Sequence, residues 1–137
     1  MGDIKGIQPE AVMRYMLLIY ANEETREAMS TEDHERAMDQ ARAVIDEATQ
    51  RGIFRGADPL QPASTATTVR IEHGKALVTD GPFAETKEQL GGYFILDCKD
   101  LDEALEWAAK IPVSCGAGKG SIEVRPIREM QQSIAVE

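Results

Sequence analysis

Two stretches of the chain share one pattern, a run of apolar β-forming residues followed by an amphipathic helix. The first joins residues 14–20 to a helix over 31–51, and the second joins residues 92–97 to a helix over 101–111. A strand, a helix and a further strand in this order form a βαβ unit. The repeated pattern therefore restricts the chain to folds in which helices pack on a sheet.

Capping residues set the limits of both helices. Ser30 can cap the first helix and Gly52 can end it, while Asp100 can cap the second and Pro112 ends it. Each helix has an apolar stripe on one face. The stripes consist of Ala37, Met38, Ala41, Val44, Ile45 and Ala48, and of Leu101, Ala104, Leu105, Ala108 and Ile111. These faces are predicted to cover the sheet, and residues 22–29 are predicted to form one or two helical turns.

The other strands are shorter. We expect a strand over 53–57, a rigid connector over 58–62, a hairpin over 67–79 turning at His73-Gly74, and an edge strand over 122–127. The mostly apolar residues 14–20 are typical of a central strand buried on both faces. The predicted class is α+β, a ferredoxin-like split βαβ fold with an inserted β-hairpin, an antiparallel sheet and helices on one face.

The length of 137 residues predicts one domain. We expect a flexible N-terminal extension over 1–12, where no hydrophobic period is visible, and a domain over 13–130. The last residues, 131–137, are predicted to be a C-terminal tail.

The charge balance excludes several classes of partner. Fifteen basic and 24 acidic residues give a formal charge of −9, which disfavours direct binding to nucleic acid and to anionic membranes. The apolar run 15–21 is too short to span a bilayer, and no secretory signal is recognised. Cys98 and Cys115 are too few for a disulfide framework, so we predict a cytoplasmic protein.

No cofactor motif is visible in the sequence. The two histidines and the two cysteines are too widely spaced to predict a metal site, and no phosphate loop or dinucleotide fingerprint occurs. We therefore predict neither a metal nor an organic cofactor.

The segment over 79–92 carries the most chemical information. Asp80-Gly81-Pro82 has the composition of a tight turn, since Asp bonds nearby backbone, Gly permits positive φ and Pro fixes the next residue. Three charged residues follow at Glu85, Lys87 and Glu88, where flanking strands could hold them at a site mouth. Gly91-Gly92 permits a close backbone approach.

These residues resemble a known family. The segment DGPFAETKEQLGGYFILD is similar to the DGPF-domain branch of the YCII-related family, and the stretches RYMLLIY, LDEALEWAAKIP and IEVRPI extend the resemblance over about residues 14–128. The resemblance implies a ferredoxin-like fold that forms a homodimer through its sheet, as in the dimeric α/β-barrel group. It also implies that some members are small-molecule enzymes and that DGPF proteins are associated with extracytoplasmic-function sigma factors.

The resemblance also suggests a catalytic pair. The YCII branch uses a His and an Asp, with the His early in the first helix, where His34 stands here. No Asp matches the second position, because Asp46 and Gln50 are out of register, so Asp80 is the available acidic partner. Imidazole suits general acid–base chemistry near neutral pH.

Each candidate has a structural alternative. His34 could be an exposed residue of the first helical turn, Asp80 could serve only the turn, and Glu85, Lys87 and Glu88 could be a solvated charge cluster. Tyr15 and Tyr20 lie on opposite sides of their strand, so one could face a substrate cavity and the other a dimer interface. Tyr15 is the substrate-binding candidate.

Two functions follow as hypotheses. The first is a cofactor-independent small-molecule enzyme in which His34 and Asp80 transfer protons and Tyr15, Glu85, Lys87 and Glu88 contact the substrate. The second is a non-catalytic ligand-binding or regulatory module that acts beside a sigma factor, with its acidic surface meeting a basic protein.

Overall fold

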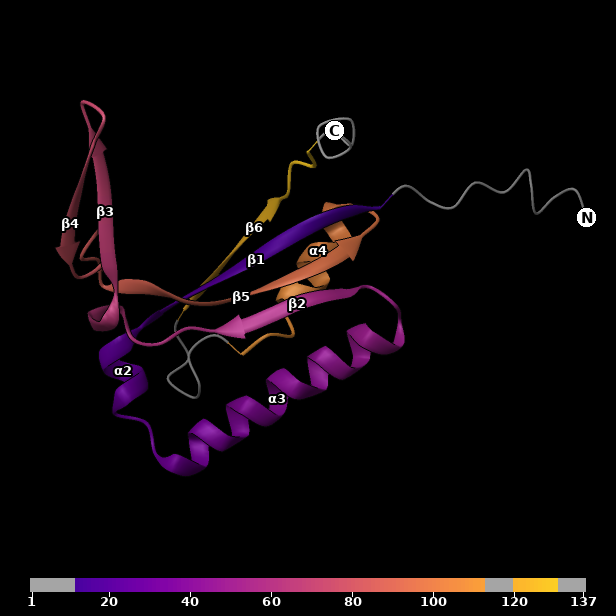
Figure 1. Ribbon diagram of the computed structural model, residues 1–137. Helices are drawn as coiled ribbons and strands as arrows, with labels where there is room; N and C mark the ends of the chain where they lie inside the picture. Colours follow the sequence, from indigo (N-terminus) through magenta and orange to yellow (C-terminus); the bar gives the residue numbers. More distant parts are fainter. Residues whose placement is uncertain (1–11, 113–119, 131–137) are drawn as a thin grey trace, which may run out of the picture.

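The computed structural model describes residues 12–112 and 120–130 (Figure 1). Almost all of the predicted N-terminal extension, the whole predicted C-terminal tail and Cys115 lie outside the described residues.

Four antiparallel strands form the main sheet, in the order β2-β5-β1-β6. Their bounds are β1 Met13–Asn22, β2 Phe54–Pro59, β5 Glu88–Cys98 and β6 Ser121–Pro126. The two strands that open the βαβ units are central and the two that close them are the edges, which confirms the ferredoxin-like α+β fold and the edge position of the last strand.

Two strand limits differ from the prediction. β2 extends through Asp58 and Pro59, because an edge strand tolerates a proline at its end. β5 begins at Glu88, because residues 88–90 continue the ladder with β1.

The helices begin where the caps predict. They are α2 Glu23–Glu27, α3 Thr31–Gln50 and α4 Leu101–Ala108, with a short 3₁₀ turn, η1, over Ala63–Thr65. The Ser30 hydroxyl accepts a hydrogen bond from the Asp33 amide at 3.0 Å, and the Asp100 carboxylate accepts one from the Glu103 amide at 2.9 Å. α4 ends earlier than predicted because tighter turn bonds carry the chain from Ala108 to Ile111.

One face of the sheet carries the core. Helices α3 and α4 pack on this face, and the buried cluster consists of Tyr15, Leu17, Phe94, Leu96 and Cys98 from the strands with Val44, Ala48, Ala104, Trp107 and Ile111 from the helical segments. Trp107 is 3% exposed and belongs to this core. Helices on one face and an antiparallel sheet are both confirmed.

The opposite face is open, so the prediction that β1 is buried on both faces is wrong for the described chain. Met16 and Leu18 of β1 and Ile95 of β5 are only partly covered, because no second layer packs over them. Two ion pairs lie at one end of this face, where Arg14 is the register partner of Asp97: Arg14–Glu129 at 2.8 Å and Arg55–Asp97 at 2.6 Å.

Two further strands, β3 Thr67–Glu72 and β4 Lys75–Asp80, form a separate hairpin. Its turn has positive φ at His73 and Gly74, 52° and 78°, as a two-residue turn of this kind requires. Figure 1 shows the hairpin standing away from the body, on the side of the sheet opposite α3. The predicted hairpin and its turn are confirmed.

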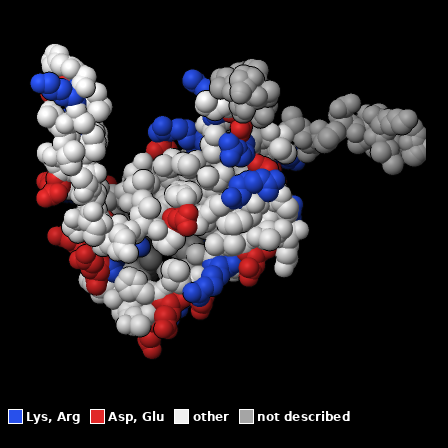
Figure 2. All heavy atoms as spheres, viewed as in Figure 1, with Lys and Arg blue, Asp and Glu red and all other residues white. Residues whose placement is uncertain are grey.

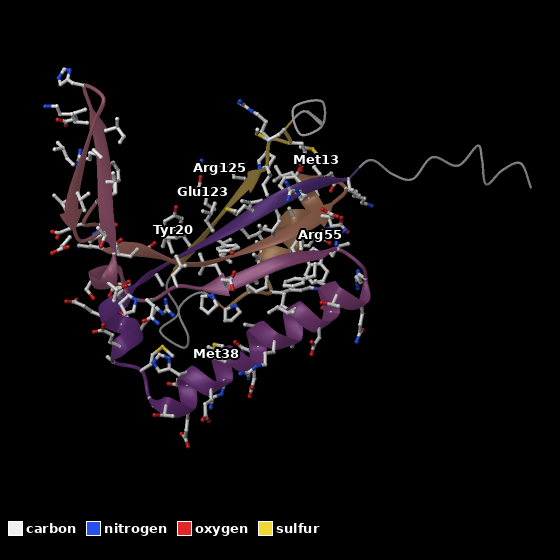
Figure 3. All side chains as sticks on the ribbon, viewed as in Figure 1. Met13, Tyr20, Met38, Arg55, Glu123 and Arg125 are labelled. Atoms are coloured by element: carbon white, nitrogen blue, oxygen red, sulfur yellow. The ribbon has the colours of Figure 1, made fainter. Side chains whose placement is uncertain are left out.

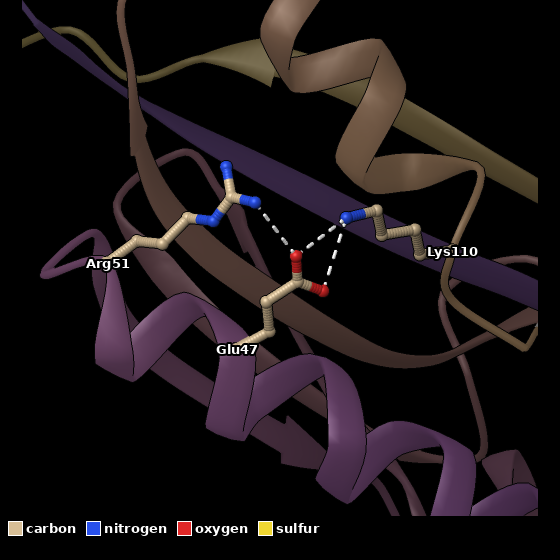
Figure 4. A network of polar contacts seen from close by, with 3 residues as sticks. All are labelled: Glu47, Arg51 and Lys110. Atoms are coloured by element: carbon tan, nitrogen blue, oxygen red, sulfur yellow. Dashed lines mark hydrogen bonds and ion pairs between the residues drawn. The ribbon is translucent and has the colours of Figure 1, made fainter.

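A polar network joins the end of α3 to the segment after α4 (Figure 4). The Lys110 ammonium lies 3.1 Å from the Glu47 carboxylate, which Arg51 also contacts at 3.2 Å. The same ammonium lies 4.3 Å from the centroid of the Trp107 ring. These groups are well exposed, so the ion pairs contribute about 0–1 kcal/mol to the free energy of unfolding. Their main effect is to hold Lys110 next to Trp107.

A bulge at Gly91 and Gly92 shapes the sheet next to α2. Ile19 pairs with Gly92 and Tyr20 with Leu90, which leaves Gly91 as the extra residue of β5. A Cβ on Gly92 would lie 2.9 Å from the Asp58 carbonyl oxygen, so only glycine allows β2 to approach this closely. The close backbone approach predicted from the Gly-Gly pair is therefore present.

The Gly92→Ala variant tests this approach. We expect the free energy of unfolding to fall by about 1–3 kcal/mol, because the added methyl must push backbone atoms apart. Gly56→Ala is the matched control, since a Cβ there meets no atom within 4 Å, and it should leave stability unchanged or raise it by up to about 1 kcal/mol. Equal losses in urea denaturation would contradict this account.

Candidate functional site

A cavity of about 150 Å³ lies between α3 and the β2–β5–β1 part of the sheet. Its apolar lining consists of Ile19, Ala37, Met38, Ala41, Ile45, Ala57, Pro59, Phe94, Ile111 and Pro112. Gly91 and Gly92 line it at the bulge, where no side chain fills the space. The small side chains of Ala37 and Ala41 leave space unfilled between α3 and the sheet at this point.

Met38 was expected to pack against the sheet, but its side chain is 44% exposed. Figure 3 shows it on the side of α3 that faces the sheet, and it lines the cavity. Met38 therefore lies at the edge of the cavity and does not fill the core. The same figure shows Tyr20, Glu123 and Arg125 on the other face of the sheet.

Two arginines bring positive charge to the cavity, Arg26 of α2 and Arg42 of α3. Arg42 is largely exposed and pairs with Asp39 at 2.9 Å. Asp58 also borders the cavity, but its carboxylate accepts a hydrogen bond at 2.6 Å from the Tyr93 hydroxyl. Tyr93 alternates with the core residue Phe94, so this carboxylate lies toward the open face.

Arg26 is held closely against the bulge. One terminal nitrogen of its guanidinium lies 2.5 Å from the place where a Cβ on Gly91 would stand. The side chain is partly buried, and among residues 12–112 and 120–130 it makes no ion pair or side-chain hydrogen bond. A partly buried guanidinium without a bonded carboxylate is an anion-binding group.

A second pocket, of about 180 Å³, shares Arg26 with the cavity. It is lined by Glu23, Arg26, Glu27, His34, Leu60 and Pro62. The Glu23 carboxylate accepts a hydrogen bond from the Ala63 amide at 2.7 Å and so ties α2 to η1. His34 lies in the first turn of α3, as predicted, and its side chain borders this pocket.

The other candidate residues lie elsewhere. Glu85 and Lys87 line a third, wider hollow near the start of α2 and η1. Asp80 is the exposed last residue of β4, and it lines none of the three hollows. Glu88 opens β5 and accepts a hydrogen bond from the Ser121 hydroxyl at 3.3 Å. The structure thus brings His34 beside Glu23 and Glu27, with Asp80 outside that pocket.

Tyr15 is 5% exposed and belongs to the core cluster, while Tyr20 lies on the open face, where its hydroxyl donates to Glu123 at 3.5 Å. Opposite orientations of the two tyrosines were expected. The Asp80-Gly81-Pro82 turn also forms as expected: φ of Gly81 is 102°, its amide donates to the Ala66 carbonyl at 2.7 Å, and its carbonyl accepts from the Thr68 hydroxyl at 2.8 Å.

Two perturbed groups lie away from the cavity. Burial raises the pKa of the Cys98 thiol to about 11, which disfavours the thiolate, so Cys98 acts as a small buried apolar group. The hydrogen bond to Asp58 raises the pKa of Tyr93.

Sequence reasoning missed Arg26 as a site residue. The signal was present, because Arg26 is the one basic residue in the otherwise acidic run Glu23–Glu27, and Gly91 removes the side chain that would block it. Their proximity depends on the bulge, and although glycines in a strand are typical of a bulge, no local pattern relates it to α2. Figure 2 shows acidic groups gathered over the α2 and α3 side of the molecule.

No helix in the part of the chain that the structure describes is long and apolar enough to cross a membrane.

Comparison with known proteins identifies relatives. The model of the YCII-related domain matches residues 13–131. The uncharacterized protein R00369 of Rhizobium meliloti (strain 1021) is 41% identical over 115 residues, which cover 84% of this chain and 92% of that protein. The chain therefore belongs to the YCII-related domain family.

Proposed function

We propose that this protein is a cofactor-independent small-molecule enzyme in which His34 transfers protons to a substrate seated in the apolar cavity. One observation carries the proposal: the pocket lined by His34 and the apolar cavity share Arg26. A ligand in the cavity can therefore direct a polar end past the guanidinium toward the imidazole.

The acidic partner of His34 is a separate step. Glu27 lines the same pocket and is exposed, whereas Glu23 is engaged with the Ala63 amide. Glu27 is thus a carboxylate that could orient the imidazole within one pocket. The pair of His34 and Asp80, with Tyr15, Glu85, Lys87 and Glu88 as substrate contacts, stays a prediction from the sequence.

Exchange of carbon-bound hydrogen tests the role of His34. A panel of small keto acids and lactones is incubated with the protein in D₂O, and loss of C–H signals is followed by NMR. We expect His34→Gln to slow the exchange of any active compound by about 10²–10⁴-fold, the usual contribution of a general acid–base group.

His73→Gln is the matched control, because His73 lies in the hairpin turn and lines none of the three hollows. It should leave the exchange rate unchanged. Exchange that is equally fast in His34→Gln would contradict the assignment.

A non-catalytic ligand-binding or regulatory module acting beside an extracytoplasmic-function sigma factor is the alternative. The formal charge of −9 favours it, since an acidic surface attracts a basic protein partner. The same panel separates the two roles, because a module would be stabilised by a ligand without exchanging its hydrogens. Both roles belong to the cytoplasm, the compartment predicted from the sequence.

We further propose a homodimer that covers the open face, in the manner of a dimeric α/β barrel. The open face has a partly exposed apolar centre, and the hairpin on the same side of the sheet (Figure 1) carries an exposed apolar patch on one face. By register that patch consists of Val69, Ile71, Ala76 and Val78. A two-stranded hairpin is marginally stable alone, and a two-fold contact would cover both surfaces at once.

Sedimentation at micromolar concentration tests the dimer. The wild-type chain should sediment as a dimer, and Ile71→Lys, in the apolar patch of the hairpin, should shift it to monomer. Leu77→Lys is the matched control, because Leu77 is an exposed residue on the opposite face of the same hairpin and should not disturb the contact. A monomeric wild type would contradict the proposal.

A further inference from the structure

We propose that the helix–sheet cavity takes a small monocarboxylate with an apolar ring or short chain, and that Arg26 binds its carboxylate. This inference rests on the proposed function and names the substrate class of the same site.

The size of the cavity limits the size of the apolar part of the ligand. Its volume of about 150 Å³ is close to that of engineered apolar cavities that bind benzene. Apart from Arg26, Arg42 and Asp58, the side chains that line it are aliphatic or aromatic, contributed by α3, by the strands β1, β2 and β5, and by the segment after α4. A ring of six carbons fits this space, and a larger ligand would have to extend out past Met38.

The positive charge at the cavity determines the polar group of the ligand. The guanidinium of Arg26 stands against Gly91 at one end of the apolar lining, in a place that a side chain on Gly91 would occupy. The planar guanidinium matches a carboxylate through two parallel hydrogen bonds. Arg42 is a weaker candidate, because Asp39 already pairs with it.

The residues around Arg26 also limit the number of negative charges that the ligand can carry. Glu23 and Glu27 line, together with Arg26 and His34, the second pocket and not the apolar cavity. A second anionic group reaching into that pocket would meet these two carboxylates. The site should therefore select a monocarboxylate over a dicarboxylate and leave the polar pocket for an uncharged group near His34.

Three probes of nearly equal size test the charge requirement: benzoate, benzyl alcohol and benzylamine. Their affinities for the full chain are measured by ligand-observed NMR at low salt. We expect benzoate to bind at least about tenfold more tightly than the alcohol and the amine, since the charge-assisted pair exists only for the anion.

Variants then locate the site. Arg26→Gln should weaken benzoate by about tenfold and leave benzyl alcohol unchanged, and Ala41→Phe should weaken all three probes by filling the cavity. Arg36→Gln is the matched control, because Arg36 lies on α3, pairs with Asp33 at 2.7 Å and lines none of the three hollows. It should bind benzoate as the wild type does.

Several results would overturn the inference: no binding of benzoate, equal affinity for benzoate and benzyl alcohol, or undiminished benzoate binding by a folded Arg26→Gln variant. Arg26→Lys is the control for misfolding, because it keeps the positive charge and should retain part of the affinity for benzoate. A failure of the proposed function gives a different result from a failure of this inference. In that case His34→Gln would keep both benzoate binding and any hydrogen exchange.

Discussion

The contact on which the site depends is the approach of the Asp58–Pro59 backbone and the Arg26 guanidinium to the two glycines of the β5 bulge. Gly92 lets β2 lie 2.9 Å from the place of its missing Cβ, and Gly91 leaves room for the arginine. Gly91 is the extra residue of the bulge, and both glycines line the same cavity. Any side chain here would displace an edge strand or expel the only basic group of α2.

The two faces of the sheet have different tasks in this account. The helix face holds the core at one end, around Leu17 and Leu96, and the cavity at the other, where α3 carries alanines at 37 and 41. The open face has a partly exposed apolar centre with ion pairs at one end, where Arg14 lies beside Asp97, a composition suited to contact with a protein. Ligand chemistry and assembly can thus change independently.

Sequence patterns predicted the fold well, whereas the residues that line the cavity could not be found from them, for a physical reason. Caps at Ser30 and Asp100, the apolar periodicity and the His73-Gly74 turn are local, and each element forms where they indicate. The cavity depends on which side chains of α3 meet the sheet in space, and the place of Arg26 depends on a bulge 65 positions along the chain from it. His34 was recognisable from its helix position, whereas its neighbours Glu23 and Glu27 were not.

Amide chemical shifts of the ¹⁵N-labelled full chain during a benzoate titration test the central claim most directly. The account predicts that the amides of Gly91, Gly92 and Ala41 shift together with one dissociation constant, while those of Val69 and Val78 in the hairpin stay in place. Shifts confined to the hairpin or to open-face residues such as Leu18 and Ile95, with the glycines unmoved, would contradict it.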